Sequence, residues 1–229
     1  MLARRIVTEY RAERCAAVFA AMREAGTWLV PTHVTREEDA RSADPAFLAD
    51  PRLDYLDPLS RWALEDDLGA VAARYPSDSD KAALRAYFEH GRKLTGEAHR
   101  AGVRVLVGTD TTIGGFRYHD EMAHLVAAGL SPAEVLRAAT IQAARYAGEE
   151  HTAGSIAVGK RADLVLLRAN PLDDIANTRT IAAVWMNGRH YDRALLDALL
   201  EYTGRQARSP RLVLRLLTGF ARSSVQSDL

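Results

Sequence analysis

The stretch Val105–Thr112, which reads VLVGTDTT, decides the fold class of this 229-residue chain, because an apolar run ends there in a carboxylate. Residues 103–108 become apolar on both faces, which is typical of a strand covered on two sides in a parallel sheet. Two roles for Asp110 follow. It caps a loop, which the pattern alone favours, or it belongs to an active site, because parallel sheets present functional groups just beyond their strand ends.

Helical and strand patterns alternate around this stretch. Residues 27–34 (TWLVPTHV) predict an earlier strand that ends near Pro31, since proline cannot donate to a central ladder. A polar excursion with a short helix is expected over residues 35–58, where prolines recur. The segments with helical hydrophobic spacing are 13–26, 59–75, 81–102, 119–128 and 131–148. This alternation predicts βαβ units and an α/β fold.

The last of these helices has the clearest boundary signals. Ser131 and Glu134 predict a capping box at its start, and Gly148 predicts its end. After Gly148 the chain is rich in β-formers and turn residues, and Asn187–Gly188 predicts a hairpin.

We therefore expect three parts in the chain. Residues 1–148 form an α/β part, residues 149–195 form a β-rich part, and residues 196–229 form a C-terminal helix and tail. The final residues, 221–229, are expected to fray.

Composition excludes several classes of protein. Lys plus Arg and Asp plus Glu number 30 each, so no overall field would attract nucleic acid or an anionic membrane. The single cysteine, Cys15, excludes an internal disulfide and a cysteine-rich zinc site. No segment approaches the roughly 18 apolar residues of a membrane span, and no secretory signal is recognised. We expect a cytoplasmic protein without nucleic-acid or membrane partners.

Two runs of sequence resemble a known family. Residues 108–148 read GTDTTIGGFRYHDEMAHLVAAGLSPAEVLRAATIQAARYAG, and residues 154–189 read GSIAVGKRADLVLLRANPLDDIANTRTIAAVWMNGR. Together they strongly resemble the C-terminal part of the amidohydrolase superfamily, especially its imidazolonepropionase-like and prolidase-like branch. The resemblance is close over residues 100–195 and looser over residues 26–36, GTWLVPTHVTR.

The resemblance implies a TIM-like (β/α)8 barrel flanked by a small β-sandwich. Residues 1–148 then correspond to the last strands of the barrel, and residues 149–195 to part of the sandwich. Asp110 is implied to end the eighth strand, to contact a catalytic divalent metal (zinc by resemblance) and to act as general base. Such a metal lowers the pKa of bound water, and a nearby carboxylate accepts the proton. The implied activity is hydrolysis of a carbon–nitrogen bond in a cyclic amide, dipeptide-like or related small molecule.

The family's other metal ligands find no match in this sequence. The family uses a His-x-His pair, but no two of the seven histidines are separated by a single residue. One carboxylate does not hold a catalytic metal, since catalytic zinc sites have about three protein ligands. Missing strands would also leave open sheet edges. We therefore expect a fragment that needs a missing N-terminal portion or pairs with another chain, including a second copy.

Two alternatives remain open from the sequence. The chain is a catalytically inactive remnant or interaction module, or it is a complete small α/β protein that uses Asp110 with His33 and His119.

Three further residues are candidates for substrate binding. His33 and Arg36 follow the first predicted strand and would line the barrel mouth, where a guanidinium clamps a carboxylate; an ordinary loop pair is an equal alternative. His119 has two interpretations. It lies in the loop after Asp110 and contacts substrate, or it is an ordinary residue at the start of a helix; we favour the second. The other histidines are expected at the surface or away from the barrel mouth: His90, His99, His124, His151 and His190.

Overall fold

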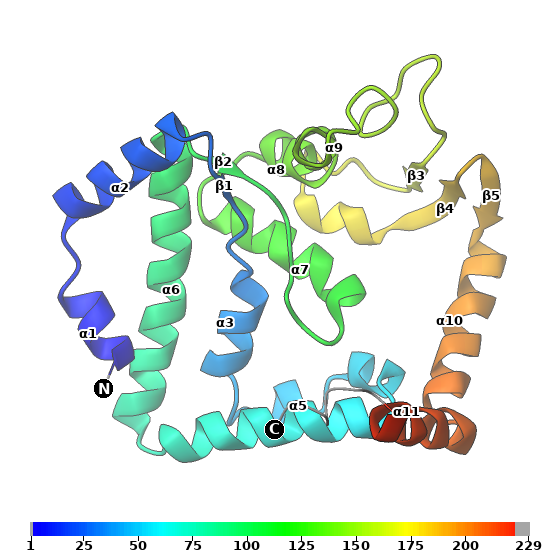
Figure 1. Ribbon diagram of the computed structural model, residues 1–229, viewed down its shortest axis with the longest axis horizontal. Coiled ribbons are helices and arrows are strands. Elements are labelled where there is room, and N and C mark those ends of the chain that lie inside the picture. The colour runs from blue at the N-terminus through cyan, green and yellow to red at the C-terminus, as the bar shows by residue number, and fades with distance from the viewer. Residues whose placement is uncertain (1, 223–229) are drawn as a thin grey trace.

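Two small sheets organise the helices of this chain. The computed structural model describes residues 2–222, and Figure 1 shows the elements in chain order from blue to red. One sheet pairs β1 with β2 in parallel, and the other is antiparallel with the order β3-β4-β5. This mixture of helices and a few strands agrees with the predicted α/β class. Within residues 2–222 the strands do not close into a barrel.

The parallel sheet consists of two short strands. β1 (Trp28–Leu29) is hydrogen-bonded to β2 (Arg104–Val105), with Trp28 opposite Arg104. The N–H of Leu106 also donates to the carbonyl of Leu29 at 2.9 Å. Each strand pairs on one side only among the described residues, so both keep the open edge that the sequence predicts.

Both strands are shorter than predicted, and the backbone shows why for β1. Thr32 adopts a left-handed conformation with φ 49°, and His33 begins helix α3 (His33–Ala40). The prediction of a strand over residues 27–34 is therefore wrong beyond its first residues. Residues 103–108 likewise contain only the two strand residues of β2.

The helices predicted on either side of residue 76 form, and their caps are visible. α5 (Pro58–Arg74) follows Asp57, whose carboxylate accepts hydrogen bonds from backbone N–H groups in the first turn. α6 (Asp78–Arg100) follows Ser77, whose hydroxyl accepts from the N–H of Asp80. Such caps satisfy N–H groups that have no partner within the helix.

Two helices precede β1 and pack along one side of the molecule (Figure 1). The sequence predicts α2 (Ala12–Glu24) but not α1 (Leu2–Thr8). Contacts join α1 to α6.

The excursion between α3 and α5 is more ordered than predicted. It contains α4 (Pro45–Leu48) and the 3-10 helix η1 (Pro51–Tyr55). Each begins at a proline that follows an aspartate, and the carboxylates of Asp44 and Asp50 cap them. Proline suits the first helical turn because its missing N–H would have no helical partner there.

Three helices follow β2, with boundaries that differ from the predicted ones. α7 (Gly114–Ala127) begins inside the segment expected to be a loop, well before His119. The single helix predicted over residues 131–148 forms as α8 (Pro132–Ala139) and α9 (Ile141–Ala147).

The boundary signals of this helical segment are confirmed. Ser131 and Glu134 form the complete capping box, and Gly148 ends α9 with φ 72°. The break between α8 and α9 falls at Thr140, whose φ and ψ of −130° and −93° are not helical.

The β-rich part is a three-stranded antiparallel sheet. β3 (Leu164–Leu167) pairs with β4 (Ile181–Met186), which pairs with β5 (Arg189–Asp192). The 3-10 helix η2 (Ile175–Arg179) connects β3 to β4 and contacts α7. Asn187 and Gly188 form the predicted hairpin turn, both with positive φ.

Two helices end the described chain. α10 (Arg193–Ala207) follows β5, and α11 (Pro210–Arg222) comes after it, where the sequence predicts one helix and a tail. Most of the segment expected to fray, residues 223–229, lies outside the described residues. Within residues 2–222, no helix is both long and apolar enough to cross a membrane.

Two apolar clusters hold α7 and fix the loop before it. The end of α7 packs with β2 and α8 through Val105, Met122, Leu125, Leu130 and Val135. The residue before α7, Ile113, packs with α4, η1 and α5 through Phe47, Leu53, Leu64 and Leu68. The loop that carries Asp110 therefore runs from one cluster to the other.

Candidate active site

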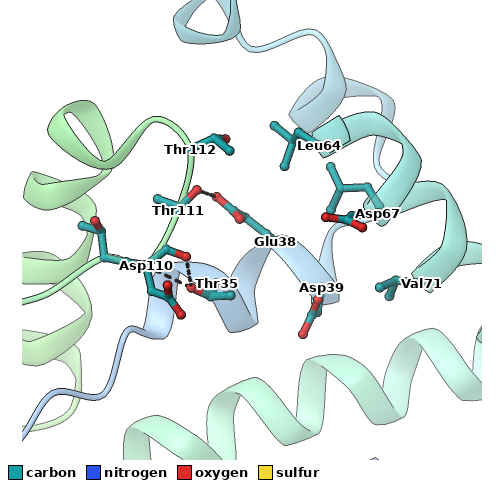
Figure 2. Close-up of a pocket in the computed structure, with 11 residues that line it drawn as sticks. Thr35, Glu38, Asp39, Leu64, Asp67, Val71, Asp110, Thr111 and Thr112 are labelled. Atoms are coloured by element: carbon teal, nitrogen blue, oxygen red, sulfur yellow. Dashed lines mark hydrogen bonds between the residues drawn. The ribbon is translucent and has the colours of Figure 1, made fainter. Parts of the chain in front are cut away.

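The loop after β2 places Asp110 beyond the carboxyl end of the parallel pair. Asp110 is exposed, with φ 47° in the left-handed region that non-glycine residues rarely adopt. The hydroxyl of Thr35 lies 3.0 Å from each of the carbonyl oxygens of Thr109 and Asp110. The hydroxyl of Thr111 donates to the carboxylate of Glu38 at 2.6 Å. Helix α3 therefore holds this loop at two points (Figure 2).

A groove of about 520 Å³ opens beside Asp110, between α3, α5 and the loop (Figure 2). Its wall on α5 includes the apolar residues Leu64, Leu68 and Val71. The carboxyl groups that line it are those of Glu38, Asp39, Asp67 and Asp110. Burial raises the pKa of Glu38 and of Asp39, so both retain protons to a higher pH than an exposed acid.

A buried arginine anchors α3 to α7 behind this loop. Arg117 is 2% exposed, and its guanidinium donates to Glu37 at 2.5 Å and to Asp120 at 2.9 Å. Burial alone would raise the pKa of Glu37, but the hydrogen bond from His124 and the charge of Arg117 outweigh it and lower this pKa to about 2. Glu37 is therefore ionised and pairs with Arg117 at neutral pH. Arg52 also binds Asp120, at 2.8 Å.

A residue of α7 caps the first turn of α3. The side chain of Thr32, which precedes α3, makes no capping hydrogen bond. Instead the fully buried carboxylate of Glu121 accepts from the N–H of Val34 at 2.9 Å. Burial raises the pKa of Glu121, and the N–H groups at the start of α3 oppose that rise. Glu121 and Arg117 together fix the position of the helix that holds the Asp110 loop.

Two of the predicted substrate residues, His33 and Arg36, lie in α3 but outside the groove. His33 is 2% exposed, beside Gly91 of α6 and 6.3 Å between ring centres from His124. Arg36 is exposed and pairs with Asp39 at 2.9 Å. Asp39 lines the groove, so its partner Arg36 lies in solvent next to the groove. His33 is buried and does not.

The third predicted substrate residue, His119, lies inside α7 rather than in a loop or at a helix start. Its Nδ1 is 3.0 Å from the hydroxyl of Thr178, in η2. Burial lowers the pKa of His119, and the charge of Arg179 acts in the same direction. His119 therefore joins α7 to η2, away from the groove.

Three histidines of α6 and α7 are predicted at the surface. The prediction is wrong for His90 and His124, whose side chains are largely buried, whereas His99 is partly exposed. His90 is 9% exposed and packs edge-on against Tyr10. The Nε2 atom of His124 lies 3.3 Å from Glu37, and His99 lies 3.2 Å from Glu134. The sequence gives no signal for these contacts, because each partner lies on a different element. His151 and His190 are exposed in the β-rich part.

Acid is expected to destabilise the fold through His33. Burial, together with the charges of His124 and Arg92, lowers the pKa of His33 from 6.5 to about 4. As the pH falls below 6.5, the unfolded chain binds a proton that the folded chain does not take up until about pH 4. The contribution of neutral His33 to the free energy of unfolding is therefore complete above pH 6.5. It decreases by about 3 kcal/mol as the pH approaches 4.

Urea unfolding of the wild type and of His33→Phe, at neutral pH and near the folded-state pKa, measures this effect. The variant should lose less stability than the wild type between the two conditions. Equal losses would assign the acid sensitivity to other groups.

The described residues do not form the zinc site that the family resemblance implies. No group of three or more His, Cys, Asp or Glu side chains within residues 2–222 is placed to hold a metal ion. Near Asp110, the carboxylate of Glu38 is already bonded to Thr111. Asp110 is thus a single donor among the described residues.

Comparison with curated proteins gives similarity to part of this chain. An ochratoxinase from Aspergillus niger is 31% identical over 112 residues, which are 47% of this chain and 23% of that protein. An imidazolonepropionase from Treponema denticola is 36% identical over 95 residues, which are 38% of this chain and 23% of that protein. The matches therefore span less than a quarter of the length of these relatives.

Solved structures and a family profile cover more of the chain. A bottromycin amidohydrolase superposes with a TM-score of 0.63 at 25% identity, covering 88% of this chain and 46% of that chain. A prolidase complexed with N-methylphosphonate-L-proline gives a TM-score of 0.50 at 25% identity, covering 78% and 38%. The profile described as the amidohydrolase family matches residues 5–190. Since that match includes most of the sequence, the chain belongs to the amidohydrolase family.

Proposed function

We propose that this chain supplies part of the active site of a hydrolase that cleaves a carbon–nitrogen bond in a small amide. The observation that carries the proposal is the exposed carboxylate of Asp110, placed beyond the carboxyl end of β2 beside a groove of about 520 Å³. Membership of the amidohydrolase family supports this reaction class. Similarity to proteins described as an imidazolonepropionase, a prolidase and a bottromycin amidohydrolase supports a cyclic amide or dipeptide-like substrate.

In this proposal Asp110 is the general base. Its carboxylate accepts a proton from the attacking water as the new carbon–oxygen bond forms. It then returns that proton to the leaving nitrogen as the carbon–nitrogen bond breaks. The exposure of Asp110 allows both transfers, and the hydrogen bonds of Thr35 and Glu38, both in α3, with the loop keep the loop in place during them.

The groove suggests how a substrate is bound. Its apolar wall on α5 would pack against the apolar part of the substrate. Glu38 and Asp39, whose pKa values are raised by burial, would donate or accept hydrogen bonds. We propose that Arg36 binds a substrate carboxylate at the edge of the groove, where it now pairs with Asp39. His33 and His119 support the helices instead.

We further propose that hydrolysis needs barrel strands and metal ligands beyond those described. Family members generally use a divalent metal, but the donors within residues 2–222 do not fit one. The free edges of β1 and β2 would pair with the additional strands, from an N-terminal portion or from another copy. Residues 1–148 would then complete a barrel, residues 149–195 would join a sandwich, and residues 196–229 would form a C-terminal appendage.

One observation favours a second candidate, a non-catalytic interaction module. The described part of the chain has no group of side chains able to hold a metal. The zinc content after incubation with zinc and dialysis separates the candidates. It is measured for this chain alone and again for this chain together with the additional barrel strands. Zinc retained only by the completed barrel supports the hydrolase, and none in either case supports the module.

Asp110→Asn is expected to lower kcat by about 100-fold to 10,000-fold, the usual contribution of a general base. The assay uses the longest polypeptide encoded by the reading frame that contains this chain, with N-acyl amino acids, dipeptides and cyclic imides as substrates. Asp173→Asn is the matched control, because Asp173 is an exposed aspartate outside the groove. Unchanged turnover in Asp110→Asn, with active wild type, would remove Asp110 from the reaction.

A further inference from the structure

We propose that the end of the parallel sheet opposite Asp110 binds a small anion carried on a planar ring, such as an aromatic carboxylate or an aryl phosphate. The residues are Trp28 of β1, Arg104 of β2, and Arg145 and Tyr146 of α9. None of them lines the Asp110 groove, so this site is independent of the proposed hydrolysis.

A hollow made of two neighbouring cavities is present at this end of the sheet. A cavity of about 470 Å³ is lined by Trp28, Arg104, Gln142, Arg145, Tyr146 and Glu150. Arg104 and Gln142 also line a neighbouring cavity of about 280 Å³, which Arg137 borders. The two cavities therefore share lining residues, and the larger one alone has room for a small ring with one substituent.

The charge of this hollow is positive. Arg104, Arg137 and Arg145 form no ion pair with a carboxylate within the described part of the chain, and all three are exposed. Glu134 is already bonded to Ser131 and His99. The Ser131 hydrogen bonds lower the pKa of Glu134, so Glu134 and Glu150 both count as carboxylates, and three guanidinium groups face two of them.

The aromatic residues orient this charge. The guanidinium of Arg104 lies 5.0 Å from the ring centre of Trp28, directly across the two strands. Stacking fixes a guanidinium plane and leaves its N–H edge free for two parallel hydrogen bonds, which match a carboxylate or a phosphate. Tyr146 packs edge-on against Trp28 at 5.9 Å and is 65% exposed. Its free ring surface gives a planar ligand a partner for stacking.

The two ends of the sheet have opposite charge, which favours the same assignment. The groove at the carboxyl end is lined by the carboxyl groups of Glu38, Asp39, Asp67 and Asp110. The hollow at the amino end is lined by arginines in a chain whose formal net charge is zero. The lining of the hollow is therefore the more attractive of the two for an anion.

Tryptophan fluorescence tests the proposal directly. The chain has three tryptophans, so Trp62→Phe and Trp185→Phe leave Trp28 as the reporter. Phenyl phosphate or benzoate should change its emission saturably, and the better of the two identifies the anionic group. Neutral benzamide and inorganic phosphate should each bind at least about 10-fold more weakly, because one lacks the charge and the other lacks the ring.

Variants at the arginines complete the test. Arg104→Gln with Arg145→Gln should weaken binding of the preferred anion by at least about 10-fold, since two charge-assisted contacts are removed. Arg74→Gln, at an exposed arginine on the distant end of α5, should leave binding unchanged. Equal urea-unfolding midpoints exclude misfolding. Absence of saturation, equal binding of benzamide, or undiminished binding in the double variant would overturn the proposal.

Discussion

Arg117→Met is expected to lower the free energy of unfolding by about 3–5 kcal/mol, the usual cost of removing one partner from a buried ion pair. Arg117 is 2% exposed and donates to Glu37, Asp120 and the carbonyl of Val34. Methionine has a similar length, so the loss comes mainly from charge. Half-buried Glu37 would keep only His124 and the longer contact with Arg41 at 3.5 Å, whereas Asp120 keeps Arg52 and Arg179.

Urea unfolding at neutral pH measures this loss, and two other variants identify its origin. Arg36→Met removes an exposed arginine that pairs with Asp39, and it should cost less than about 1 kcal/mol. Arg117→Met combined with Glu37→Gln should recover part of the loss, because the carboxylate that has lost its shortest ion pair is then uncharged. If Arg117→Met costs no more than Arg36→Met, the buried pair does not anchor α3 to α7.

Gly96→Ala is expected to destabilise the protein by about 3 kcal/mol, at the upper end of the usual cost of overpacking. A Cβ atom at this position of α6 would lie 2.0 Å from the backbone carbonyl oxygen of Ala128. Because the contact is with backbone, it cannot be relieved by a side-chain rotation. The end of α7 would have to move away from α6 and would disturb the apolar cluster around Leu125.

Two other helical glycines are matched controls for this substitution. A Cβ at Gly91, in the same helix, would meet His33 at an ordinary distance of 3.9 Å, and one at Gly69 would meet nothing within 4 Å. Alanine at either position should raise stability by about 0.5–1 kcal/mol, since glycine is the costlier residue in a helix. Thermal and urea unfolding of the three variants make the comparison. Equal stability of Gly96→Ala and Gly91→Ala would contradict the close approach of α6 and α7.

Local signals in the sequence predicted elements whose cause is itself local. The capping box of Ser131 and Glu134 and the Asn187–Gly188 turn form as expected, because their hydrogen bonds and backbone angles involve neighbouring residues. The position of Asp110 in the loop after β2 was also recognisable, since the apolar run before it ends abruptly, although the strand itself ends earlier, at Val105. These features need no knowledge of the rest of the fold.

The polar layer between α3 and α7 could not be predicted in this way. Arg117 and Glu37 are 80 residues apart, and nothing near either one indicates its partner. The start of α3 was missed for the same reason, because its cap is Glu121 on another helix rather than a side chain beside Val34. Burial of a charged residue depends on the group across the interface, and hydrophobic periodicity does not report that group.

The parallel pairing of β1 with β2 has a consequence for the order in which the chain is assembled. Helices α3, α5 and α6 lie between the two strands in sequence, so their pairing must close a long loop. The entropy of that closure is lost before the strand contacts compensate for it, whereas α8 and α9 meet their neighbours over short connections. During synthesis, β1 leaves the ribosome long before β2 exists, and its backbone N–H and C=O groups stay without a strand partner throughout that interval.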